Sequence, residues 1–164
     1  MTPKQFIQTI HNDPSSWAPA YFFVGEEAFL HDRCRRELFR AIPEEARSWC
    51  LTSVEWKGGG LSSVLEQALQ MPMVGPGNLF WIRDPQDFGQ ANEEDFESLQ
   101  AYLKEPPPFS TLVFAAQAPD RRRRFVTLLL KQAEVVEMRR PEPHERVRWV
   151  GALLRDQQID MDRE

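Results

Sequence analysis

Short apolar runs recur along the chain at regular intervals, and a longer segment with helical spacing follows most of them. Five such runs predict strands over residues 20–25, 52–58, 78–84, 111–116 and 134–138. The first run, AYFFVG, is apolar at consecutive positions and closes on glycine. This pattern is typical of a strand that is buried on both faces of a parallel sheet.

Four of the intervening segments place apolar residues at the three- and four-residue spacing of an amphipathic helix. They cover residues 26–42, 61–71, 93–105 and 121–133. Pro43 and Pro72 end the first two helices, and Asp120 is placed to cap the fourth. The alternation of strands and helices predicts a three-layer α/β sandwich with a mostly parallel five-stranded sheet and right-handed crossovers.

The pattern changes near residues 139–143. Residues 1–140 hold the whole alternating pattern, whereas residues 141–164 open with an amphipathic helix that has Val147, Val150, Leu153 and Leu154 on one side. The sequence therefore predicts one α/β domain followed by the beginning of a second, helical domain that the chain does not complete.

Composition and charge exclude several functional classes. The chain has 164 residues, of which 41% are hydrophobic and 27% charged, as in soluble globular proteins. Its net charge of −5 argues against a domain that coats nucleic acid. No apolar run has the ~18–20 residues that span a bilayer, and Cys34 and Cys50 provide neither a disulfide framework nor a metal cluster. We expect a cytoplasmic protein without metal, cofactor or membrane contact.

The turn after the first strand is the usual phosphate cradle of a parallel α/β sheet. If Gly25 is aligned with the first glycine of a GxxxxGK[ST] loop, the second glycine falls on Leu30, the lysine on His31 and the hydroxyl on Asp32. Glu26 and Glu27 add two carboxylates where a phosphate would lie. The sequence predicts a degenerate, non-binding phosphate loop made of Gly25, Glu26, Glu27, Leu30, His31 and Asp32.

Other candidates for catalysis are weak, and the sequence does not predict an enzyme. Asp84 ends the third strand where an ATPase would hold magnesium, but Pro85 replaces the glutamate that would polarise water, so a turn or capping role is favoured. His31 and Cys34 share a helix face without a third, orienting group, which favours a surface histidine and a buried cysteine.

An apolar connection after the second helix is the most unusual stretch. Met71, Met73 and Val74 flank Pro72 and precede a Gly-Pro-Gly turn, although loops normally lack apolar side chains. These residues either enter a partner's groove, which suits flexible methionine, or pack under the end of the sheet. Periodicity alone favours packing.

Two further features were interpreted as structural. The run Arg121–Arg124 opposes the dipole of the helix that it begins, which favours a solvated surface over a patch for an acidic partner. The tryptophans Trp17, Trp49, Trp56, Trp81 and Trp149 are expected to pack in domain cores.

Taken in order, several segments resemble the delta subunits of the bacterial DNA polymerase III clamp loader. They are YFFVGEEAFL, LEQALQMPMVGPGNLFWIRD, LQAYLKEPPPFSTLVFAA, PDRRRRFVTLLLKQAEVVEM and PHERVRWVGALL, spread over residues 18–155. The resemblance implies an AAA+ type first domain that has lost nucleotide binding, then a small helical domain and a helical collar. It also implies a chain that stops soon after the second domain begins.

The resemblance further implies binding without catalysis. Delta binds the sliding clamp and holds one ring interface open, while related ATPase subunits hydrolyse ATP. The family's hydrophobic pair, often Leu-Phe, enters an apolar pocket of the clamp, and Met73 and Val74 match it, with Met71 one turn back. The implied partners are the clamp, the ATPase subunits and delta-prime, with DNA reached only through the assembled complex. The alternatives are a divergent phosphate-loop NTPase and an α/β scaffold subunit that binds no clamp.

Overall fold

The fold is a five-stranded parallel sheet covered by helices on both faces, as the alternating pattern predicts. The computed structural model describes residues 1–12, 17–75 and 77–139. The strands are β1 (Ala20–Val24), β2 (Leu51–Glu55), β3 (Asn78–Arg83), β4 (Ser110–Ala116) and β5 (Glu134–Glu137), in the order β2-β3-β4-β1-β5. Every neighbouring pair is parallel. The prediction of a helical domain at residues 141–164, with Trp149, lies outside the described residues.

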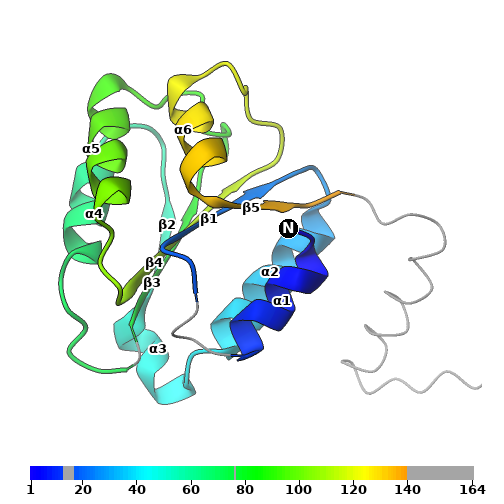
Figure 1. The fold of residues 1–164 in the computed structure, drawn as a ribbon, viewed down its shortest axis with the longest axis vertical. Coiled ribbons are helices and arrows are strands. Elements are labelled where there is room, and N and C mark those ends of the chain that lie inside the picture. The colour runs from blue at the N-terminus through cyan, green and yellow to red at the C-terminus, as the bar shows by residue number, and fades with distance from the viewer. Residues whose placement is uncertain (13–16, 76, 140–164) are drawn as a thin grey trace, which may run out of the picture.

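Helices α4 (Leu61–Ala68), α5 (Glu93–Lys104) and α6 (Arg124–Gln132) cover one face of the sheet, and α1 (Pro3–Asn12), α2 (Ala28–Arg40) and α3 (Glu44–Cys50) cover the other (Figure 1). Strand β1 contributes alternate residues to two separate cores. Ala20, Phe22 and Val24 pack on the side of α4 to α6, and Tyr21 and Phe23 pack on the side of α1 to α3. This alternation is the two-residue period of a strand.

Two helices of the second face were not predicted. Helix α1 buries Phe6 edge-on against Tyr21 and Phe23, with ring centroids 5.0 and 4.9 Å apart. The predicted helix over residues 26–42 is shorter than expected and is followed by α3, a separate helix. Arg47 of α3 donates from Nε to the carbonyls of Phe39 and Ile42, which satisfies the end of α2.

Two other helix boundaries differ from the prediction. Helix α4 ends at Ala68 instead of residue 71, because Pro72 disfavours helical backbone in the residue before it and the Asn78 side chain donates to the carbonyl of Gln70 (2.7 Å). Helix α6 begins at Arg124, with Arg123 as its N-cap, so Asp120 does not cap it. Asp120 instead accepts the backbone N–H of Arg122 in the preceding turn.

Candidate functional site

The turn after β1 is closed by the chain's own contacts. Only Gly25–Glu27 separate β1 from α2, and the Gly25 N–H donates to the carbonyl of Ala116 (3.3 Å). The backbone φ of Gly25 is +139°, and a β-carbon there would collide with the backbone carbonyl of Met138. Glu27 N–H also faces the carbonyl of Met138 (3.4 Å). Glycine is therefore needed at position 25 because the turn and the backbone of Met138 approach too closely for a side chain.

The residues at the lysine and hydroxyl positions are engaged with neighbouring groups. His31 Nε2 donates to the carbonyl of Gly25 (2.7 Å), and burial lowers the pKa of His31, so the ring is neutral at pH 7. Asp32 forms ion pairs with Arg35 (3.3 Å) and Arg36 (3.1 Å). Leu30 is buried in the core. None of these groups supplies the cation or the open backbone N–H groups that a phosphate needs.

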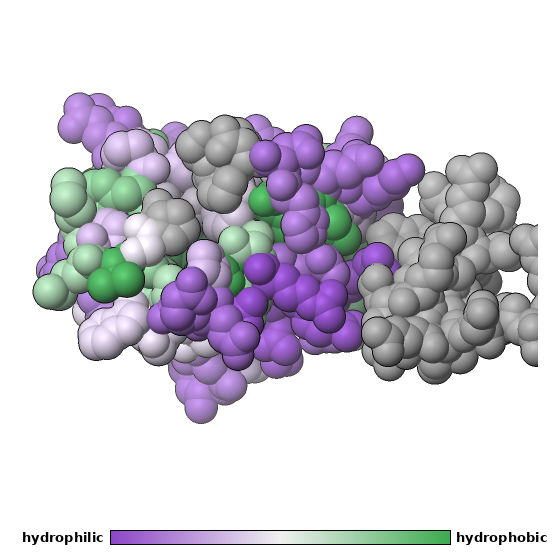
Figure 2. Space-filling model, turned by 90° about the horizontal axis from the view of Figure 1, so that it is seen from below, coloured by the Kyte–Doolittle hydropathy of each residue, from purple (hydrophilic) through white to green (hydrophobic). Residues whose placement is uncertain are grey.

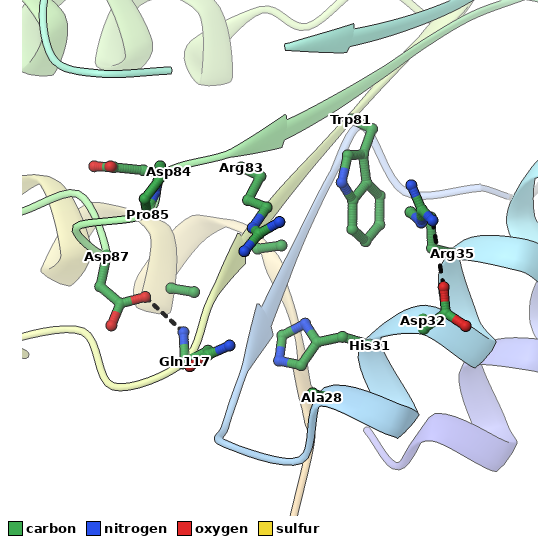
Figure 3. Close-up of a pocket in the computed structure, with 12 residues that line it drawn as sticks. Ala28, His31, Asp32, Arg35, Trp81, Arg83, Asp84, Pro85, Asp87 and Gln117 are labelled. Carbon is green, nitrogen blue, oxygen red and sulfur yellow. Dashed lines mark hydrogen bonds and ion pairs between the residues drawn. The ribbon is translucent and has the colours of Figure 1, made fainter. Parts of the chain in front are cut away.

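A cavity of about 340 Å³ opens beside this turn, between α2 and the carboxyl ends of β3 and β4. In Figure 3 the His31 ring lies between two interacting pairs, Arg35 with Asp32 on one side and Asp87 with Gln117 on the other. Ligands of parallel α/β proteins bind at this edge of the sheet. The acidic side chains of the cavity, however, already have partners: Asp32 pairs with arginines of α2, and Asp84 and Asp87 accept backbone N–H groups of the loops.

Asp84 acts as a turn residue, as its sequence context favours. It is 3% exposed and accepts the backbone N–H groups of Gln86 and Phe88, both at 2.7 Å. Asp87 was not singled out from the sequence. It accepts the N–H groups of Gln117 (2.6 Å) and Ala118 (2.9 Å), and so ties the loop after β3 to the loop after β4. A single aspartate in a polar loop gave no signal for this role.

Cys34 does not provide a nucleophile. Its side chain is fully buried, and burial raises the pKa of the thiol to about 12. The thiolate form that reacts is therefore negligible near neutral pH. The prediction of a buried cysteine is confirmed, whereas His31 is half-buried in the cavity wall and is not a surface residue as predicted. Within residues 1–12, 17–75 and 77–139, no three His, Cys, Asp or Glu side chains are grouped as a metal site.

The basic run lies mostly in the turn before α6. Arg122 pairs with Asp120 (3.0 Å) and lowers the pKa of that carboxyl to about 2. Arg124 pairs with Glu93 (2.7 Å) and lies over the Phe96 ring, 4.2 Å from its centroid. The expected solvated surface is confirmed, because the side chains of Arg121 to Arg124 are exposed. Only Arg124 of the run lies in the first turn of the helix, whereas the sequence placed all four arginines there.

The second candidate site is the α4–β3 loop (residues 69–75). It lies at the amino ends of the strands, whereas the phosphate turn lies at their carboxyl ends. Its large apolar side chains are exposed: Leu69 by 53%, Met71 by 76%, Met73 by 95% and Val74 by 50%. The alternative in which these residues pack under the sheet is therefore wrong. Figure 2 shows green, apolar atoms at the left end of the view, the end where α3 and this loop lie, and a second green group right of centre.

The backbone of the α4–β3 loop is held at both ends, although its side chains are exposed. The Asn78 amide donates to the carbonyl of Gln70, and the Cys50 thiol of α3 donates to the carbonyl of Val74, both at 2.7 Å. Ser110 Oγ donates to the carbonyl of Ala68 at the end of α4 (2.5 Å). The loop therefore presents Met71, Met73 and Val74 from a fixed backbone.

The prediction that Trp49 packs in the core is wrong. Trp49, the penultimate residue of α3, is 70% exposed, while Trp56 and Trp81 are 4% and 5% exposed, as expected. Helix α3 is buried at Ala46 and Cys50, whereas Trp49 is left exposed. Of the helices that the structure describes, none is long and apolar enough to cross a bilayer.

Two solved structures resemble this chain in fold. The Bacillus subtilis DNA clamp loader delta protein aligns with a TM-score of 0.74 and 17% identity, over 95% of this chain and 48% of that protein. A DNA polymerase III gamma subunit-related protein from Thermotoga maritima aligns with a TM-score of 0.60 and 13% identity, over 96% and 53% of the two chains. The chain thus spans about half the length of both proteins.

The comparison with curated proteins gave no match. The family model described as DNA polymerase III, delta subunit, matches residues 21–139, well over half of the chain. This match includes the closed phosphate turn and the α4–β3 loop, and it confirms the resemblance found in the sequence. The chain therefore belongs to the DNA polymerase III delta subunit family.

Proposed function

We propose that this chain is the clamp-binding, non-catalytic part of a clamp loader, and that it engages the sliding clamp through the α4–β3 loop. One observation carries the proposal: Met73, 95% exposed, extends from a loop whose backbone is fixed by hydrogen bonds. Exposed apolar groups on an ordered backbone are typical of protein-binding surfaces. Membership of the delta family supports the clamp as the partner.

The fixed backbone favours binding because little freedom is lost when the loop docks. Ordering a loop and its side chains on association costs about 0.5–1.5 kcal/mol per immobilised side chain. In the α4–β3 loop the bonds from Asn78 and Cys50 already restrict the backbone, so only the methionine and valine rotamers remain to be ordered. The apolar area of Met71, Met73 and Val74 then contributes directly to affinity in an apolar pocket.

Ring opening follows in this proposal as a shift in population. The clamp interface fluctuates between closed and open forms, and a loop that binds the open form better stabilises it by the difference in affinity. The chain needs no covalent chemistry for this task. ATP hydrolysis and contact with DNA belong to the other subunits of the assembled loader.

We expect no binding of nucleotide by this chain. Titration of the chain with Mg·ATP in a calorimeter should give only heats of dilution, because the turn after β1 is closed against Met138 and the position of the phosphate-binding lysine is the neutral His31. An ATPase subunit of the loader, titrated under the same conditions, serves as the positive control. Saturable heat with micromolar affinity would instead support the divergent NTPase.

The proposed function is tested directly by mixing the chain with the sliding clamp of the same organism and separating the mixture by size. Co-elution of both proteins in one peak, ahead of either alone, is expected. If the chain elutes apart from the clamp, but in a second run co-elutes with the other loader subunits, it is a scaffold subunit and the clamp assignment is wrong.

A further inference from the structure

The large apolar side chains that are exposed are concentrated in one place. Apart from Met1, those in the described ranges are Trp49 of α3 and Leu69, Met71, Met73 and Val74 of the α4–β3 loop. Single exposed apolar residues are ordinary on protein surfaces, whereas a contiguous group marks an interaction site. Trp49 is 70% exposed, and tryptophan is the side chain most enriched among residues that dominate binding energy.

Trp49 is structurally joined to the loop although 20 or more residues separate them in sequence. Its neighbour Cys50 donates from Sγ to the carbonyl of Val74 (2.7 Å). Gly75 lies so close to α3 that a β-carbon there would come within 2.5 Å of Cys50 Sγ and 3.2 Å of the Ala46 β-carbon. Cys50, the neighbour of Trp49, is therefore held against the loop, and we call the exposed side chains of Trp49, Leu69, Met71, Met73 and Val74 the α3–loop surface.

The residues around Trp49 favour a protein partner. Gln70 of the loop is exposed and uncharged, and the charged Glu45, one turn before Trp49 in α3, is also exposed. Interface centres are depleted of charge and enriched in aromatic residues and methionine, with polar groups at the rim. The α3–loop surface has this composition, and it is continuous with the group proposed to enter the clamp.

We propose that Trp49 is a second anchor for the sliding clamp, which contacts the clamp surface beside the pocket that takes Met73 and Val74. The proposal rests on the proposed function and adds a residue and a helix to it. The partner proposed for Trp49 is the clamp. The bond between Cys50 and Val74 holds the end of α3 next to the α4–β3 loop, so a protein that binds the loop also meets α3. A second copy of the chain is the competing occupant.

The affinity test compares Trp49→Ala with Ser48→Ala, a change at the adjacent exposed position of the same helix. The full 164-residue chain is titrated with clamp by surface plasmon resonance or calorimetry. We expect Trp49→Ala to raise the dissociation constant on the order of 30-fold, as the loss of a dominant interface residue does. Ser48→Ala should change it less than about twofold, since it removes one small polar atom. Circular dichroism and the thermal midpoint should match wild type for both.

A spectroscopic test follows Trp49 itself. Among the tryptophans in the described residues, Trp56 and Trp81 are buried and Trp17 is half-buried, so Trp49 is the one of these that clamp binding should most desolvate. Addition of clamp is expected to shift the chain's emission to shorter wavelength and to reduce quenching by acrylamide. Trp49→Phe should lose most of this change while it retains binding, because phenylalanine keeps an aromatic ring at the site.

The outcomes separate the two proposals. If Met73→Ala with Val74→Ala abolishes clamp binding but Trp49→Ala binds like wild type, the second anchor is wrong and the proposed function stands. If the wild-type chain does not bind clamp, both are wrong. If light scattering shows that the chain alone dimerises and that Trp49→Ala makes it monomeric, the surface binds a second copy and the second anchor is overturned.

Discussion

Replacing Met73 and Val74 together by alanine is expected to abolish clamp binding while the domain stays folded. The two side chains are 95% and 50% exposed, so their loss removes almost no packing within the chain. Burial of a methionine or valine side chain contributes about 1.5–3 kcal/mol. Losing both should therefore cost ~3–5 kcal/mol of binding free energy, or on the order of a hundredfold to a few thousandfold in affinity.

The control for this change is a second pair of exposed residues, Lys131→Ala with Gln132→Ala, at the end of α6 beside the edge strand β5, which lies three strands along the sheet from β3. This variant should bind clamp as the wild-type chain does. Affinity is measured with immobilised clamp, and the fold is checked by circular dichroism and thermal unfolding. Clamp binding that survives the Met73 and Val74 changes would show that the contact lies elsewhere on the molecule.

Gly25→Ala is expected to be the most damaging single substitution in the phosphate turn. Its φ of +139° is one that L-residues rarely adopt, and the new β-carbon would meet the backbone of Met138, which cannot rotate away. Backbone strain costs about 1–3 kcal/mol and overpacking about 1–3 kcal/mol more. A total of ~3–5 kcal/mol is a large part of the ~5–15 kcal/mol that stabilises a typical domain.

Gly59→Ala is the matched control because Gly59 also has a positive φ, +76°, yet no atom lies within 4 Å of the added β-carbon. Only the cost of left-handed backbone remains, about 1–2 kcal/mol. The free energies of unfolding are compared by urea titration followed by circular dichroism. A Gly25→Ala variant that does not accumulate in folded form agrees with the prediction. Equal stability of the two variants would mean that the turn is not held against Met138.

The sheet and its covering helices were predictable because their signals are local. Apolar runs identify the strands, and β1 to β5 all lie within a few residues of the predicted segments. Helix α1 also has a local signal that the prediction missed, because Thr2 and Gln5 form a reciprocal cap and the buried Phe6 and Ile10 lie four residues apart. Helix α3 is seven residues long, too short for a clear helical period.

In the candidate sites too, some features follow from local residue types and others depend on contacts between residues that are distant in sequence. The missing phosphate-binding chemistry at Leu30, His31 and Asp32 could be deduced from the residue types alone. The exposure of Trp49 could not, because tryptophan is usually buried and only the docking of α3 through Ala46 and Cys50 turns it outward. Periodicity favoured packing for Met73 and Val74, and their exposure depends on backbone bonds from distant residues.

The parallel sheet separates the closed turn after β1 from the α4–β3 loop. The closed turn follows the carboxyl end of β1, whereas the α4–β3 loop precedes the amino end of β3. The two therefore lie at opposite ends of the strands, roughly 15–20 Å apart for strands of this length. The His31 bond to Gly25 and the approach of Gly25 to Met138 hold the turn closed in this structure. Allosteric control by nucleotide requires two states with different affinities. If the turn binds no nucleotide, as we expect, any control over access to the exposed methionines has to come from outside this domain, through neighbours that cover or release the loop.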